Sequence, residues 1–174
     1  MSDMLIAEQL VAEKIPGKRK GLDRPAFLHS YHVRDILKEH GCENDVCIAG
    51  LLHDVIEDGG VTFDELSDMG FSSRVVELVD LASHDAKLAS GDERWVVMMA
   101  RLVRASDVDA WSIKVADLIS NIADSSGMPM DRRAWMLTIK APIMLRLSES
   151  HLGKTKLWRA LSDARQRELI GALS

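Results

Sequence analysis

The segment from residue 44 to residue 56 constrains the fold more than any other part of this sequence. Drawn as a helix, it is apolar on nearly every side, with Val46, Ile48, Ala49, Leu51, Leu52 and Val55 spread around its circumference. A helix at the surface keeps one polar face, whereas a helix that is apolar all round is buried. We therefore expect residues 44–56 to form a central helix that other elements surround.

The rest of the chain shows the helical period in every segment long enough to test, and strand signals are almost absent. Ser2 is placed to cap a first helix that ends before Pro16, and Thr62 with Glu65 forms a capping-box pattern. No repeat or linker divides the sequence. We predict a single all-α domain over residues 1–174. Besides 44–56, the expected helices cover about 25–40, 72–83, 92–104, 107–123, 131–148 and 154–172.

Composition and cysteine usage exclude several classes of protein. Hydrophobic residues make up 47% and charged residues 28% of the 174 positions, as in ordinary globular domains. No run approaches the ~18 apolar residues of a membrane-spanning helix, and the N-terminus lacks the positive region of a secretory signal. The two cysteines, Cys42 and Cys47, do not suggest a disulfide framework. We expect a protein of the reducing cytoplasm with no membrane partner.

The formal net charge of −5 argues against general binding to nucleic acid. The charge is unevenly spread, however, because residues 14–24 hold five basic side chains against the single acid Asp23. Such a patch suits a small anionic ligand, although a solvated basic loop has the same composition. The basic residues are Lys14, Lys18, Arg19, Lys20 and Arg24.

His53 and Asp54 lie at the end of the most apolar predicted helix. An adjacent imidazole and carboxylate are costly to bury unless a partner offsets their desolvation. A divalent metal ion is such a partner, because nitrogen and carboxylate oxygen can bind it together. His29, in the second predicted helix, and Asp117, flanked by aliphatic residues, are the further candidate ligands. Each residue alone is more often structural, but the four together favour metal binding.

Glu57 and Asp58 follow the His53-Asp54 pair by four positions. Residues four apart on a helix share a face, so both carboxylates are expected on the side of the metal ligands. There they could orient a water molecule, accept its proton or protonate a leaving group. The alternative, an acidic C-terminal cap, is disfavoured because negative charge at that end opposes the helix dipole.

These residues resemble the H…HD…D pattern of the HD superfamily of metal-dependent phosphohydrolases. Residues 51–58, LLHDVIED, are similar to a segment of the RelA/SpoT-type hydrolases of guanosine tetra- and pentaphosphate. Residues 114–121 resemble their K-L-A-D-x-x-x-N segment, and residues 19–29 resemble their R-K…P-Y-I-x-H opening. The motif-bearing core covers about residues 18–147.

The resemblance implies an all-helical HD fold, a small phosphorylated nucleotide as substrate and one divalent ion, commonly Mn²⁺. The implied reaction is hydrolysis of the 3′-pyrophosphate of (p)ppGpp to GDP or GTP and pyrophosphate. The implied metal ligands are His29, His53, Asp54 and Asp117, with His32 as the alternative to His29. Glu57 and Asp58 take the catalytic positions, and Arg19, Lys20, Lys114 and Asn121 the substrate-binding positions.

The sequence departs from this family in two places. Trp135 stands at a family glutamate and Lys140 at the tyrosine that helps to hold the nucleotide, and residues 83–87 replace a lysine-rich stretch. The alternative function is therefore hydrolysis of another phosphorylated nucleotide, with Lys140 binding a phosphate. Trp95 and Trp135 are expected to be core residues. The last predicted helix, with Leu157, Leu161, Leu169 and Leu173 on one face, could pack on the core or against a second chain in a homo-oligomer.

Overall fold

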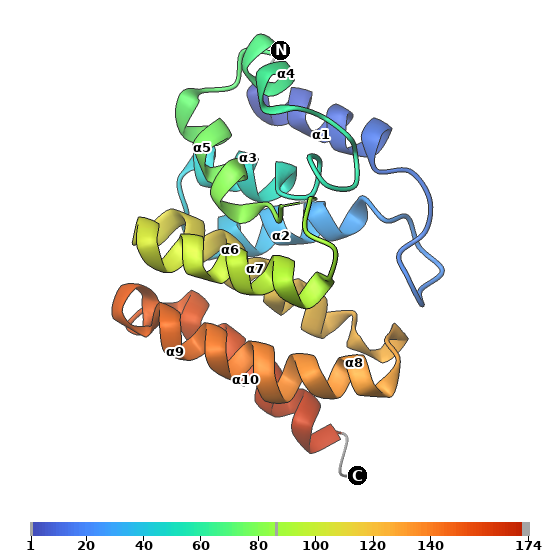
Figure 1. The fold of residues 1–174 in the computed structure, drawn as a ribbon, viewed down its shortest axis with the longest axis vertical. Coiled ribbons are helices and arrows are strands. Elements are labelled where there is room, and N and C mark those ends of the chain that lie inside the picture. The colour runs from blue at the N-terminus through green and yellow to red at the C-terminus, as the bar shows by residue number, and fades with distance from the viewer. Residues whose placement is uncertain (1, 86, 172–174) are drawn as a thin grey trace.

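The computed structural model describes residues 2–85 and 87–171, and this part of the chain folds as helices without strands (Figure 1). The all-α prediction is confirmed. In order, the elements are α1 (Asp3–Lys14), α2 (Leu28–Glu39), α3 (Asn44–Leu52), α4 (Phe63–Asp68), α5 (Ser73–Ala82), α6 (Gly91–Ala105), α7 (Val108–Ala123), η1 (Ser125–Gly127), α8 (Met130–Trp135), η2 (Met136–Lys140), α9 (Ala141–Leu152) and α10 (Lys156–Gly171).

Helix α3 lies at the centre of the first half of the chain, as its sequence predicts. Residues 46–52 of α3 are all buried, and the helix contacts α1, α2, α5 and α7. Gly50 permits the close approach of α2, because a Cβ at this position would overlap the Leu37 side chain. The tight contact between α2 and α3 brings His29 on one helix near His53 at the end of the other.

The structure shortens the central helix relative to the sequence prediction. Helix α3 ends at Leu52, not at residue 56, and residues 53–58 continue as tight turns. One cause is the His53 side chain, whose Nδ1 lies 2.8 Å from the Gly50 carbonyl oxygen and is the hydrogen-bond donor to it. Because the helix has ended, the neighbouring side chains of His53 and Asp54 are free to converge.

The helix predicted over residues 131–148 is present, but it contains a π-helical turn. Helix α8 continues directly into the π-helix η2 and then into α9 at Ala141, and the backbone stays right-handed helical at both junctions. Pro142, in the first turn of α9, has no backbone N–H and crowds the carbonyl one turn earlier, which disrupts the ordinary helical ladder. The widened turn ends at Lys140, and π-helical turns are frequent at functional sites.

Helix α10 packs on the core of the chain. It contacts α7 and α9 and buries Leu157, Leu161 and Ala164 (Figure 1, orange to red). Leu173, predicted on the same face, lies outside the described residues. Packing on the core is therefore observed for this helix, while a homo-oligomer and the domain extent of 1–174 stay predictions. None of the described helices has the length and apolar character needed to cross a lipid bilayer.

The basic segment between α1 and α2 forms a short loop closed by an isolated bridge between Lys18 and Pro25. Gly21 at its tip has φ +75° and packs so closely on η1 that a Cβ would overlap the Gly127 carbonyl oxygen. The loop is thereby held against the end of α7, where Arg19 and Arg24 both pair with the buried Asp124.

We expect Gly21→Ala to lower the free energy of unfolding by about 2–4 kcal/mol, combining left-handed backbone strain with overpacking. Urea denaturation measures this difference. Gly17→Ala is the matched control, because Gly17 also has positive φ (+93°) but a Cβ there meets nothing within 4 Å. Equal losses in the two variants would show that the contact with Gly127 is unimportant.

Candidate metal centre and its surroundings

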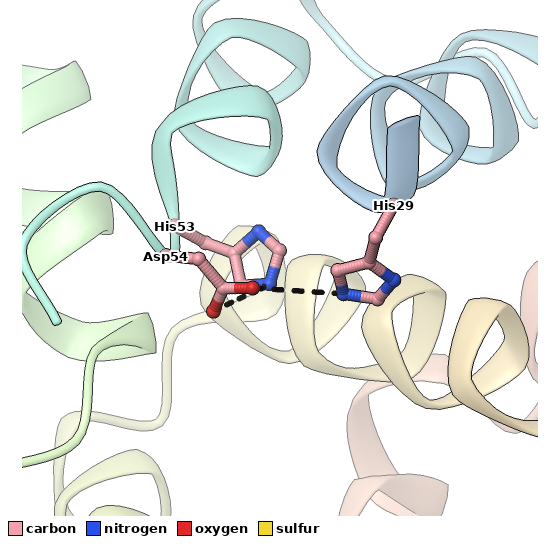
Figure 2. A group of neighbouring side chains, drawn as sticks. All are labelled: His29, His53 and Asp54. Atoms are coloured by element: carbon pink, nitrogen blue, oxygen red, sulfur yellow. Dashed lines mark ion pairs between the residues drawn. The ribbon is translucent and has the colours of Figure 1, made fainter. Parts of the chain in front are cut away.

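His29, His53 and Asp54 converge at one point although they come from two helices. Each offers one ligand atom, and these atoms all lie within 4.8 Å of one another. Figure 2 shows His29 reaching down from α2 toward His53 and Asp54, which follow the last turn of α3. Both histidines are buried, and Asp54 keeps a side-chain exposure of 23%. The group is thus enclosed by protein but open at the carboxylate.

His53 presents an unsatisfied nitrogen to this point. Its Nδ1 donates to the Gly50 carbonyl, so Nε2 is the nitrogen that a metal ion could bind in place of a proton. Nε2 is buried and makes no hydrogen bond within the described chain, although it lies 3.1 Å from Asp54 Oδ1. Buried polar atoms are rarely left without a partner. An imidazole oriented through Nδ1, with Nε2 facing carboxylates, matches the usual arrangement of a metal-binding histidine.

Asp117 joins the group from α7. Its Oδ1 lies 3.1 Å from His29 Nε2 and 3.6 Å from His53 Nε2. Asn121 also donates to Oδ1 (2.6 Å), and the buried Lys114 ammonium donates to Oδ2 (2.6 Å). These contacts place Asp117 beside both imidazoles and hold its carboxylate in one orientation.

The four residues interact strongly through their charges. Burial lowers the pKa of His53, but Asp54 and Asp117 outweigh burial and raise that pKa to about 10. Burial alone would raise the pKa of Asp117, yet Lys114 and the two imidazoles hold it well below the usual range. Burial alone would also raise the pKa of Asp54, but His53 and His29 together outweigh burial and lower that pKa. A divalent cation bound here would take the place of the proton on His53.

Ser120 connects His29 to a second histidine. Its buried Oγ lies 2.9 Å from Nδ1 of His29 and 2.9 Å from Nδ1 of His32. Arg19 Nη2, which can only donate, lies 3.1 Å from the same Nδ1 of His29, so Ser120 and Arg19 together hold this side of the ring while His29 Nε2 faces the metal group. Burial lowers the pKa of His32, so its imidazole is neutral and can accept. The geometry therefore favours His29 as the metal ligand. His32 contacts His29 through the Ser120 hydroxyl.

Glu57 and Asp58 lie beside the metal group but in different surroundings. Glu57 Oε1 accepts hydrogen bonds from the backbone N–H of His84 (2.6 Å) and from its Nδ1 (2.9 Å). Burial alone would raise the pKa of Glu57, but these bonds outweigh it and lower that pKa. Burial raises the pKa of Asp58, and the carboxylates of Asp54 and Glu57 raise it further. The two acids are therefore suited to opposite protonation states.

The predicted substrate-binding residues divide into two sets. Arg19 and Asn121 are used internally: Arg19 donates to Asn121 Oδ1 (2.6 Å) and to Asp124 Oδ2 (3.1 Å), and Asn121 also holds Asp117. Lys114 is likewise buried against Asp117. Lys20, in contrast, is exposed, and its charge lowers the pKa of Asp58 against the dominant effect of burial. Lys20 is thus available to an incoming anion.

Lys140 lies at the end of η2 over two indole rings. Its Nζ is 4.5 Å from the ring centroid of Trp135 and 5.5 Å from that of Trp95. The two rings meet edge to face, which confirms the expected packing role of Trp95, whereas Trp135 is only partly buried. Burial lowers the pKa of Lys140, and the nearby Asp117 carboxylate opposes this effect. Lys140 is therefore within electrostatic reach of the metal group.

Sequence reasoning missed Ser120 and His84. Ser120 is a buried polar residue in a largely apolar helix, and this pattern could have indicated a functional contact. His84 lies in a loop after α5, and nothing in the local sequence reports its pairing with Glu57.

An all-helical domain that brings two buried histidines and two carboxylates together has the donor set to hold a divalent cation. The model of one family, described as HD domain, matches residues 7–136. The chain belongs to the HD domain family and is related to the hydrolase domain of the SpoT and RelA proteins.

Several known proteins are similar to this chain. The guanosine-3′,5′-bis(diphosphate) 3′-pyrophosphohydrolase of Vibrio cholerae is 33% identical over 151 residues, covering 81% of this chain and 21% of that protein. The bifunctional (p)ppGpp synthase/hydrolase SpoT of Escherichia coli is 30% identical with the same coverage. The chain thus spans about a fifth of the length of these curated relatives.

Solved structures support the same fold. A metazoan ortholog of SpoT, described as hydrolysing ppGpp and playing a role in starvation responses, superposes with a TM-score of 0.79 at 25% identity. That match covers 96% of each chain. A protein of Listeria monocytogenes matches with a TM-score of 0.66 at 23% identity, over 88% of this chain and 98% of that one, and shows the fold alone.

Proposed function

We propose that this protein hydrolyses the 3′-pyrophosphate of (p)ppGpp, releasing pyrophosphate and GDP or GTP. The observation that carries this proposal is the converging His29, His53 and Asp54 group, with its unpartnered His53 Nε2, in a chain that superposes over 96% of its length on a ppGpp-hydrolysing protein. The similarity to annotated 3′-pyrophosphohydrolases supports the same reaction.

The residues that would hold the divalent ion are His29, His53, Asp54 and Asp117, and we propose Mn²⁺ as that ion. The donor set fits, because carboxylate oxygen suits Mn²⁺ and imidazole nitrogen is a common ligand of first-row divalent metals. When bound, the ion supplies a Lewis acid that neutralises charge developing on the phosphoryl oxygens. Lys114 and Asn121 then act by fixing the orientation of Asp117.

We assign the proton transfers to Glu57 and Asp58. Glu57, kept ionised by its hydrogen bonds to His84, accepts a proton from the attacking water. Asp58, whose pKa is raised by burial and neighbouring carboxylates, delivers a proton to the departing ribose 3′ oxygen. Water thus adds to phosphorus, the bond from phosphorus to the 3′ oxygen breaks, and the proton count balances. Lys20 and Lys140 provide positive charge for the phosphates.

Lys140 favours one alternative substrate class. Its ammonium packs on Trp95 and Trp135. The RelA/SpoT-type hydrolases that the sequence resembles have, at the position of Lys140, a tyrosine that helps to hold the nucleotide. A cation at that position suits a phosphate. The second candidate function is therefore hydrolysis of another phosphorylated nucleotide at the same metal centre.

The test is incubation of the protein with ppGpp in MnCl₂ or in EDTA, with products separated by anion exchange. We expect GDP and pyrophosphate only in the presence of Mn²⁺. A protein that binds Mn²⁺ but leaves ppGpp intact would contradict the proposed substrate, and a panel of other phosphorylated nucleotides would then test the alternative. We also propose a cytoplasmic location, in keeping with the free thiols of Cys42 and Cys47.

Ser120→Ala is expected to weaken Mn²⁺ binding about 10- to 100-fold, the usual effect of losing an outer partner of a ligating histidine. The variant removes the hydroxyl that holds His29 Nδ1 but leaves every ligand in place. Titration calorimetry measures the change. Ser148→Ala is the control, because among the described residues that buried hydroxyl bonds only to the Met144 carbonyl of its own helix. Unchanged Mn²⁺ affinity in Ser120→Ala would remove Ser120 from this role.

A further inference from the structure

The loop after α5 is joined to the metal-binding segment at two points. Ser83 Oγ shares its proton between the Val79 carbonyl oxygen of α5 (2.8 Å) and the backbone carbonyl oxygen of His53 (3.2 Å). The next residue, His84, contacts Glu57 Oε1 through both its backbone N–H and its ring Nδ1. Consecutive loop residues thus reach one predicted metal ligand and one predicted catalytic acid. A displacement of this loop would therefore move both the predicted metal ligand His53 and the acid Glu57.

Resting on the proposed function, we propose that His84 is a positioning residue that holds Glu57 in its reactive orientation. A glutamate side chain has three rotatable bonds, and both hydrogen bonds from His84 end on the same oxygen, Oε1. Within the described chain, Oε2 receives no hydrogen bond, so it is the oxygen available to water. The Glu57 side chain is 19% exposed and the His84 side chain 24% exposed. Their electrostatic attraction is therefore less screened by water than that of a fully exposed pair.

His84 acts through Glu57, and this makes a specific kinetic prediction. His84→Ala keeps the backbone hydrogen bond but loses the ring contact, so Glu57 gains freedom to leave the reactive geometry. We expect kcat for ppGpp to fall about 10- to 100-fold, the cost of a small misplacement of a reacting group, with KM little changed. His84→Asn restores most of kcat, because its side-chain amide can donate from near the position of Nδ1.

A double-mutant cycle tests the dependence on Glu57. In Glu57→Gln the reactive carboxylate is absent, so adding His84→Ala should lower kcat little further. Additive losses, or His84→Asn as slow as His84→Ala, would overturn the proposal. His40→Ala is the matched control: His40 Nδ1 contacts only the Ile36 carbonyl, and the residue lies about three helical turns from His29. Its kcat should equal that of the wild type.

A second measurement does not depend on the substrate. In ¹⁵N-histidine spectra, the Nδ1 signal of His84, assigned by its loss in His84→Ala, should shift in Glu57→Ala. An unshifted signal would show that His84 and Glu57 do not pair in solution and would overturn the inference. Absence of ppGpp hydrolysis by the wild type, together with this shift, would contradict the proposed function alone.

Discussion

His53→Ala is expected to abolish Mn²⁺ binding and hydrolysis together. The change removes the buried Nε2 that faces Asp54 and Asp117, so two carboxylates remain without the imidazole between them. Losing an outer partner of a metal ligand already costs about 10- to 100-fold in affinity or activity, and loss of the ligand itself should exceed that range. Titration calorimetry with Mn²⁺ and pyrophosphate release measure the two effects.

The same variant should also lose the stabilisation that the ion supplies. A ligand that binds only the folded state raises the free energy of unfolding according to its concentration and affinity. We therefore expect Mn²⁺ to raise the Tm of the wild type and to leave that of His53→Ala unchanged. His40→Ala, which removes a histidine remote from the metal group, should respond as the wild type does. An Mn²⁺-dependent increase in the Tm of His53→Ala would show that the ion binds elsewhere.

Glu57→Gln is expected to retain the fold and the Mn²⁺ affinity but to lose turnover by about 100-fold or more, as for removal of a general base. Glutamine keeps an oxygen that can accept from the backbone N–H of His84, yet its amide cannot take a proton from water. Single-turnover rates of pyrophosphate release measure the loss, and calorimetry with circular dichroism checks metal binding and folding.

Glu65→Gln is the matched control for this prediction. It makes the same chemical change in the capping box of α4, where Glu65 accepts from the backbone N–H of Thr62. Glutamine can accept the same hydrogen bond, so both turnover and stability should be close to the wild type. Full activity in Glu57→Gln would exclude the proposed role of Glu57 in proton transfer.

Local sequence pattern predicted much of the helical architecture, because each helix is encoded over a short stretch. Ser2 caps α1, Thr62 and Glu65 form the capping box of α4, and residues 46–52 of the apolar segment are buried. The structure departs from the predicted helices where a local contact disturbs the regular helical periodicity. His53 ends α3 by bonding back to Gly50, and Pro142 accompanies a π-helical turn within the otherwise continuous helix predicted over 131–148.

Helical periodicity and composition were enough to predict a helical fold with one central helix, and the motifs placed histidines and carboxylates at positions that resemble those of the family. Which of these groups meet, and what each one contacts, became visible in the packed structure. Arg19 pairs with Asp124 and Asn121 across more than a hundred residues, Ser120 links His29 to His32, and His84 holds Glu57. The physical reason is that periodicity reports which side of a helix is buried, whereas a hydrogen bond between distant residues depends on how the helices pack.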